Sequence, residues 1–169
     1  MRIDFKKFQG FRLQVVFWLA TGFGSGLCPR APGTAGSVVG LAMAYLLRNG
    51  SLRFFFWGLA IFVAVWSAHF FGKVLQVGDH QSIVIDEVVG VAIASWTAGE
   101  SAGAWLAAFL LFRFFDILKL PPVGWIDRHS KDPRHGDYFW GLGWSVVGDD
   151  LVAGLQALAV IVCFQVFFC

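Results

Sequence analysis

The stretch SIVIDEVVG at residues 82–90 decides the fold, because it places two adjacent carboxylates, Asp86 and Glu87, inside an otherwise apolar run. The residues that follow, VAIASW, add no charge. An ionised carboxylate in apolar surroundings is costly unless it is paired, hydrogen-bonded or bound to a metal. Two neighbouring carboxylates also repel each other, and a divalent cation removes both problems. The stretch therefore predicts an apolar helix that begins at a cation site.

The composition is typical of an integral membrane protein. The chain is 57% hydrophobic and 14% charged, with a mean hydropathy of +0.68, whereas soluble chains carry roughly 25% charged residues. Its 169 residues fit a single domain over residues 1–169. The net charge of +2 is too small to indicate nucleic acid binding. The three cysteines form no CxxC pair and no metal-binding spacing.

Apolar segments along the chain predict an all-α, multi-pass bundle of about five membrane-embedded helices. A basic and then apolar N-terminus predicts an additional helix lying at the membrane surface before them. The polar region at residues 121–148 predicts a surface loop with one short helix. The five membrane segments are expected at residues 34–47, 52–71, 82–96, 102–118 and 149–168.

If these five segments cross the membrane in alternating directions, the Lys and Arg residues are distributed unequally between its two sides. Only Arg48 and Arg53 then lie on the side away from the N-terminus, which leaves 11 of the 13 Lys and Arg on the other side. The positive-inside rule makes the basic side cytoplasmic, and we expect a bacterial inner-membrane protein with its site on that face.

The same alternation brings acidic helix ends together on the cytoplasmic side. Oxygen donors without a Cys or His cluster suit a hard cation, and we expect Mg²⁺. Capping of the last helix is the alternative for its two acids. For the acid of the fourth helix the alternative is an ion pair with Arg113, three residues earlier. The five predicted ligands are Asp86, Glu87, Asp116, Asp149 and Asp150.

Basic and glycine-rich residues supply candidates for phosphate binding. Arg113 and Lys119 share the end of the fourth helix and suit a phosphate, with anchoring at lipid headgroups as the alternative. The stretch TGFGSGLCPRAPGTAGS at residues 21–37 can turn tightly and aim backbone N–H groups at an anion. Its alternative role is close helix packing through Gly36 and Gly40. The remaining candidates are Thr21, Gly22, Ser25, Thr34, Ser37 and His80.

Five motifs, in this order, resemble the phosphatidylglycerophosphatase A family: residues 21–37, DHQSIVIDEVVG at 79–90, FRFFDILK at 112–119, WID at 125–127 and DDLVAG at 149–154. The resemblance implies a phosphoric monoester hydrolase of phospholipid biosynthesis that uses Mg²⁺ to convert phosphatidylglycerophosphate into phosphatidylglycerol. It implies catalytic roles for Asp86, Glu87, Asp116 and Asp150. Lys119-Leu120-Pro121, where the family often has Lys-Pro, and Cys28, where Ser is frequent, depart from its pattern.

Two other classes of membrane protein remain as alternatives. An ion-coupled transporter also carries intramembrane acids, but its acids lie at the midplane and its halves form inverted repeats. A CDP-alcohol phosphotransferase would show a spaced run of aspartates that is absent here. The expected partners are an anionic phospholipid substrate and membrane lipids, without nucleic acid, and the oligomeric state stays open.

Overall fold

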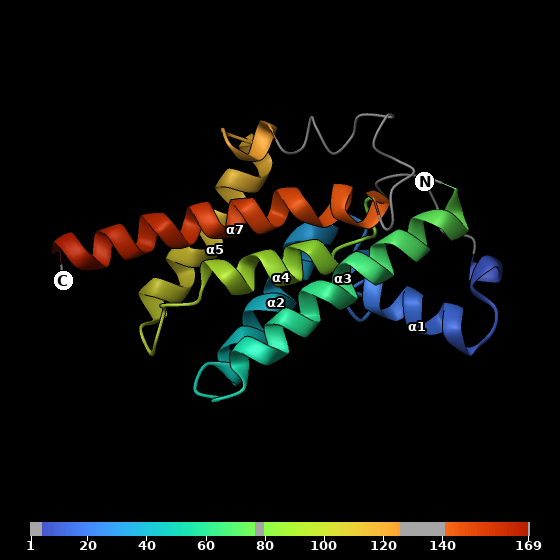
Figure 1. Cartoon of the computed structure of the whole chain (residues 1–169), viewed down its shortest axis with the longest axis horizontal. Coiled ribbons are helices and arrows are strands. Elements are labelled where there is room, and N and C mark those ends of the chain that lie inside the picture. Colours follow the sequence, from blue (N-terminus) through green and yellow to red (C-terminus); the bar gives the residue numbers. More distant parts are fainter. Residues whose placement is uncertain (1–4, 77–79, 126–140, 169) are drawn as a thin grey trace.

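The computed structural model describes residues 5–76, 80–125 and 141–168, and this part of the chain is helical without any strand (Figure 1). The predicted all-α class is therefore confirmed. Two 3-10 turns, η1 (Phe5–Phe8) and η2 (Ser25–Leu27), precede the first and second helices. The helices are α1 (Phe11–Ala20), α2 (Pro32–Leu47), α3 (Arg53–Leu75), α4 (Ile85–Ala94), α5 (Ala102–Leu118) and α7 (Gly141–Phe168).

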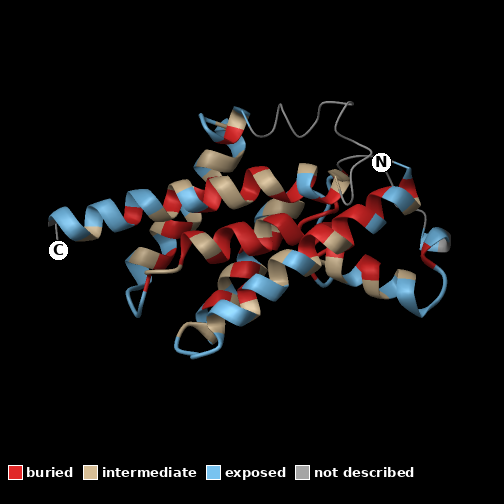
Figure 2. Ribbon diagram, viewed as in Figure 1, coloured by how far each residue is buried: buried red, intermediate tan, exposed pale blue. Residues whose placement is uncertain are grey.

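Helix α4 forms the centre of the molecule. It contacts α2, α3, α5 and α7, and Figure 1 shows it enclosed by them, with α5 crossing α7 at a steep angle. Eight of its ten residues are buried, which Figure 2 shows as a red band along the helix. A helix that is apolar and covered on all sides belongs to a protein core. The stretch at residues 82–90 thus begins the helix around which the others pack.

Small residues allow α2 to approach α4 at backbone distance. A Cβ atom added to Gly36 would lie 2.7 Å from Cβ of Val84, and one added to Gly40 would lie 2.7 Å from Cα of Val88. Side chains at these two positions would push the helices apart. The packing role considered for Gly36 and Gly40 is therefore confirmed.

Two helices in the described ranges are long and apolar enough to cross a membrane, namely α3 and α7 over Gly141–Phe167. A spanning helix needs about 20 residues, whereas α5 has 17, α2 has 16 and α4 has ten. Five separate spans are therefore not confirmed. The outer faces of α3, α5 and α7 nevertheless expose large apolar side chains such as Phe62, Leu110 and Phe164.

The last helix begins at Gly141, so its predicted start at residue 149 is wrong. The backbone of Gly143 packs on α3, where an added Cβ would lie 3.0 Å from Cγ1 of Val65 and overlap its carbonyl oxygen. This packing stabilises a helical turn that glycine disfavours by propensity. Asp149 and Asp150 consequently lie about two turns inside α7, and the capping explanation for them is wrong. Residues 126–140 of the predicted polar loop, including the WID motif's last two residues, lie outside the described residues.

Candidate active site

Carboxylates from three helices meet beside the first turn of α4. One oxygen each of Asp86, Glu87 and Asp150 lies within 4.8 Å of the other two. The carboxyl group of Asp116, near the end of α5, lies close enough to Asp150 to interact with it electrostatically, and it pairs with Arg113. Asp86 and Asp150 are only 8% and 4% exposed. The structure thus brings together four of the five predicted ligands, which we call the carboxylate cluster.

Local structure explains how the cluster is positioned. The N–H of Val84 donates to the carbonyl of Ala20 at 2.9 Å, which fixes the start of α4 against the end of α1. The N–H of Glu87 donates to Oδ1 of Asp86 at 3.0 Å, and both acids are favoured by the positive end of the helix dipole. A Cβ on Gly90 would lie 2.8 Å from the carbonyl oxygen of Asp150. Helices α4 and α7 therefore touch at backbone level about one turn after Asp86 and Glu87.

Arg113 is the cation that contacts this cluster. Its Nη1 lies 2.7 Å from Oδ2 of Asp116 and 3.9 Å from Oε1 of Glu87. The Arg113–Asp116 pair that the i,i+3 spacing suggested is therefore present, and the same Asp116 carboxyl also adjoins Asp150. Four carboxylates and one guanidinium give the described cluster a formal charge of −3 when all are ionised. Like charges this close favour binding of a cation.

Asp149 takes a different direction from Asp150. Its Oδ2 lies 2.7 Å from Nζ of Lys119, the residue that ends α5 in a left-handed conformation with φ 46°. Successive residues on a helix point about 100° apart, so the two neighbouring acids face different partners. The structure places Asp149 in an ion pair and gives the predicted phosphate ligand Lys119 a carboxylate partner.

Three hydroxyl groups of the glycine-rich stretch at residues 21–37 donate hydrogen bonds to nearby backbone carbonyls. Thr21, Ser25 and Ser37 each donate a hydrogen bond of 2.8 Å to a carbonyl three or four residues earlier. A hydroxyl has one proton to donate, so these three protons are engaged with the backbone, and contact of these residues with a phosphate stays a prediction. Gly22, at φ 52°, packs against the side chain of Val84. This half of the stretch packs against the N-terminal end of α4.

His80 and Thr34 also lie apart from the described contacts of the cluster. His80 is buried; its Nδ1 accepts the N–H of Ser82 at 3.2 Å, and its ring centroid is 6.0 Å from that of Phe71. Thr34 is exposed on the first turn of α2. The contacts of His80 therefore indicate a role in shaping the turn before α4.

The N-terminus of α2 is the part of the stretch that reaches the acids. A Cβ on Gly33 would overlap Oε1 of Glu87 and lie 3.2 and 3.3 Å from the terminal nitrogens of Arg113. The first turn of a helix also has N–H groups without intrahelical partners, and its dipole favours anions. Sequence reasoning did not single out Gly33, although Pro32-Gly33 at a helix start was a readable pattern.

Comparison with known proteins relates the sequence to one family. The sequence matches the family model described as Phosphatidylglycerophosphatase A over residues 18–165. The chain belongs to this family. The carboxylate cluster, Arg113 and Gly33 all lie inside the matched part of this phosphatidylglycerophosphatase A family member.

Three relatives cover most of the chain. The Phosphatidylglycerophosphatase A of Escherichia coli is 36% identical over 146 residues, covering 85% of this chain and 79% of the relative. That of Haemophilus influenzae is 34% identical over 157 residues, covering 90% of each. A Bacteroides thetaiotaomicron relative, 34% identical over 154 residues with 85% and 89% covered, carries the provisional name of a phosphatidylinositol-3-phosphatase. No solved structure matches the chain.

Proposed function

We propose that this family member hydrolyses the phosphomonoester of phosphatidylglycerophosphate, giving phosphatidylglycerol and phosphate, with Mg²⁺ bound by the carboxylate cluster. The observation that carries the proposal is the meeting of three carboxylate oxygens within 4.8 Å, contributed by helices far apart in the sequence. The names of the E. coli and H. influenzae relatives support this substrate and the class of phosphoric monoester hydrolases.

The donor set fits a hard divalent cation. Carboxylate oxygens bind Mg²⁺ at about 2.1 Å, so ligands on opposite sides of the ion lie about 4 Å apart. The observed spread of up to 4.8 Å needs only a small contraction to reach that geometry. Oε2 of Glu87 is buried and has no hydrogen-bond partner within the described residues. A buried anionic oxygen without a partner is costly, and a cation would remove that cost.

The residues around the cluster have distinct proposed roles. Bound Mg²⁺ would supply charge neutralisation for the phosphoryl group and acidify an attacking water. Arg113 is held by Asp116 and Glu87. The remaining N–H groups of its planar guanidinium can donate hydrogen bonds to nonbridging phosphate oxygens. The N–H groups at the start of α2, next to Gly33, can donate hydrogen bonds to the same anion. Lys119 and Asp149 would hold the end of α5 against α7.

A position in the membrane follows from the substrate. The phosphomonoester of a phospholipid lies at headgroup level, so the cluster should lie near one membrane surface with α3 and α7 crossing the bilayer. The excess of Lys and Arg that the sequence predicts on the cluster's side favours the cytoplasmic face, and the relatives come from bacteria. We therefore place the protein in the bacterial inner membrane with its site facing the cytoplasm.

A phosphate-release assay on the purified protein in detergent tests this function. We expect release from phosphatidylglycerophosphate in Mg²⁺, loss of release in EDTA and recovery when Mg²⁺ is restored. Phosphatidic acid and phosphatidylinositol 3-phosphate, assayed in parallel, should be cleaved more slowly. Equal rates with and without EDTA would contradict the metal proposal, and preference for phosphatidylinositol 3-phosphate would contradict the substrate.

The contact of Gly33 with the cluster gives a matched pair of variants. In Gly33→Ala the new methyl group displaces Glu87 and Arg113, and misplacement of this size costs up to about a hundredfold in rate. We expect kcat/KM to fall by about 10- to 100-fold. Gly103→Ala, whose Cβ would meet nothing closer than Oγ of Ser101 at 3.7 Å, should retain wild-type kinetics. Wild-type kinetics in Gly33→Ala would argue against phosphate binding at this end of α2.

A further inference from the structure

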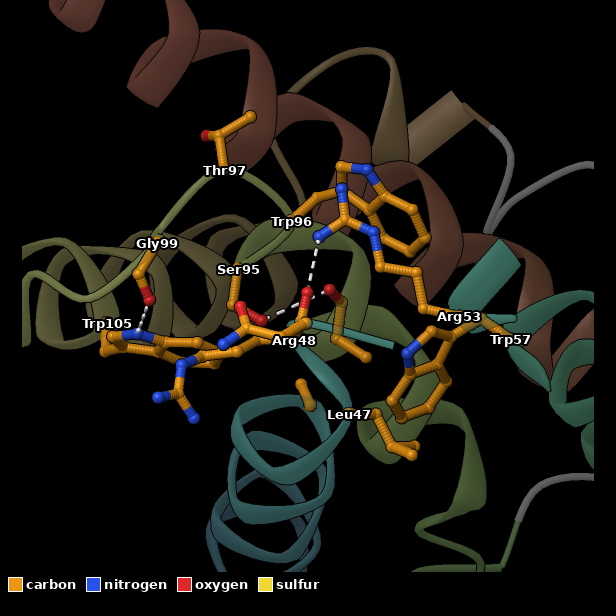
Figure 3. A pocket seen from close by; sticks show the side chains of 12 residues that line it. Leu47, Arg48, Arg53, Trp57, Ser95, Trp96, Thr97, Gly99 and Trp105 are labelled. Carbon is orange, nitrogen blue, oxygen red and sulfur yellow. Dashed lines mark hydrogen bonds between the residues drawn. The ribbon is translucent and has the colours of Figure 1, made fainter. Parts of the chain in front are cut away.

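A pocket lies at the opposite end of α4 from the carboxylate cluster (Figure 3). Its volume is about 300 Å³, and it is formed by the turn between α2 and α3, the end of α4 and the start of α5. Asp86 and Ser95, at the two ends of α4, are nine residues and therefore about 14 Å apart along the axis. The residues that define its chemistry are Arg48, Arg53, Trp57, Trp96, Thr97 and Trp105.

The two arginines give this pocket an excess of positive charge. No carboxylate is found among the described residues that line it. The acid that contacts it is Glu100, whose Oε1 lies 3.6 Å from Nη2 of Arg48 and whose side chain is 82% exposed. A solvent-exposed pair at that distance contributes little. The pocket therefore retains attraction for an anion.

The donors of the arginines are held in place but only partly used. Nη1 of Arg53 donates to the carbonyl of Arg48 at 3.1 Å, as Figure 3 shows, and Nη1 of Arg48 donates to the carbonyl of Tyr45 at 3.0 Å. Nε of Arg48 and Oγ1 of Thr97 are buried and have no hydrogen-bond partner in the part of the chain that the structure describes. Buried donors without partners are costly, and a ligand oxygen would satisfy them.

Aromatic rings orient the guanidinium groups for an anion. The guanidinium carbon of Arg53 lies 4.4 Å from the ring centre of Trp96, and that of Arg48 lies 4.1 Å from the ring centre of Tyr45. Stacking occupies the faces of the guanidinium planes and leaves their edges, where the N–H groups project. Trp105 donates through Nε1 to the carbonyl of Gly99 at 3.1 Å and so fixes the rim. Figure 3 shows the guanidinium group of Arg53 beside Trp96 and that of Arg48 on the other side of the pocket, so the two arginines offer separate positions for the oxygens of an anion.

We propose that this pocket binds a phosphate group, carried by an anionic phospholipid or present as a soluble anion. A volume of about 300 Å³ is enough for a small polar ligand. The site is separate from the proposed phosphatase centre and does not depend on its chemistry.

Native mass spectrometry of the full-length protein in detergent tests this site. The measured quantity is the fraction of protein that retains phosphatidylglycerol. It is compared between the double variant Arg48→Gln/Arg53→Gln and the control variant Arg12→Gln. Both also carry Arg113→Gln, which is expected to weaken anion binding at the carboxylate cluster. Arg12 is exposed on α1, away from the pocket. We expect at least fivefold lower retention in the double variant and unchanged retention in the Arg12 control. Equal retention in both would overturn the proposal.

Displacement of the lipid by millimolar inorganic phosphate would assign the site to a soluble anion, and resistance to it would assign the site to the lipid.

A second measurement uses the unmodified protein and does not depend on how the variants fold. Phenylglyoxal modifies accessible arginines, and peptide mass spectrometry reports the extent at each position. We expect phosphatidylglycerol to protect Arg48 and Arg53 at least fivefold, and zwitterionic phosphatidylcholine to give little protection. Identical labelling in the two lipids would mean that these arginines are general headgroup anchors, which would overturn the proposal.

Discussion

Replacing Asp86 or Asp150 by Asn is expected to lower kcat on phosphatidylglycerophosphate by at least about a hundredfold, the scale seen when one electrostatic contact to a transition state is lost. Each variant keeps the side-chain shape and removes one negative charge from the carboxylate cluster. Asp149→Asn, one residue away, should lose less than about tenfold, because its carboxylate faces Lys119. Phosphate release from the three purified proteins, at saturating substrate and Mg²⁺, measures the difference.

Stability separates loss of the site from loss of the fold in these variants. Without metal, Asp86 is buried beside two other carboxylates, so removing its charge relieves repulsion and the cost of burial. In EDTA the Tm of Asp86→Asn should equal or exceed that of the wild type. Added Mg²⁺ should raise the Tm of the wild type, because a ligand that binds only the folded state stabilises it, and should leave that of Asp86→Asn unchanged. A variant with normal kcat, or with a wild-type response to Mg²⁺, would contradict the proposed ligand role.

Replacing Arg113 by Gln is expected to have a comparably large effect on rate and the opposite effect on stability. The variant loses the donor fork for phosphate and leaves Asp116 and Glu87 without their cation. Breaking a buried ion pair costs about 3–5 kcal/mol, and somewhat less here because these side chains remain 16–18% exposed. We expect kcat/KM to fall by about a hundredfold or more and the Tm in EDTA to fall by several degrees.

Arg113→Lys is the matched control for this prediction. Lysine keeps the charge and loses the planar fork, so the Tm should recover most of the loss while kcat/KM recovers only in part. Rate measurements and thermal unfolding in detergent, both in EDTA and in Mg²⁺, provide the comparison. Full activity in Arg113→Gln would exclude phosphate binding by this residue, and full recovery in Arg113→Lys would reduce its role to charge alone.

The end of α4 that carries the carboxylate cluster could be predicted from the sequence because local chemistry determined it. Asp86 and Glu87 lie in the first turn of α4 as expected, and Asp116 lies in the last turn of α5. A charged residue in an apolar run is easy to recognise as a candidate site, because its burial is costly unless it has a functional or structural partner. The side on which Asp150 and Asp149 point, by contrast, depends on the rotation of α7 against α4, which no local pattern specifies.

Other features depended on tertiary contacts and were missed or wrong. Hydropathy does not distinguish a helix covered by protein from one covered by lipid, so α4 was predicted to span the membrane although other helices enclose it. The polar composition of residues 121–148 suggested a loop, whereas residues 141–148 form the first turns of α7, where Gly143 packs on α3. The pocket that contains Arg48 and Arg53 forms only when three segments meet, so sequence spacing gave no indication of it.

Direct measurement of cation binding tests the central claim, which is that Asp86, Glu87, Asp116 and Asp150 form one divalent-cation site. Mn²⁺, a paramagnetic substitute for Mg²⁺, can be titrated into the full-length protein in detergent and its free fraction followed by electron paramagnetic resonance. We predict saturable binding that Mg²⁺ displaces, that persists in Asp149→Asn and that is lost in Asp86→Asn and Asp150→Asn. Absence of saturable binding in the wild type, or equal binding in all three variants, would contradict the claim.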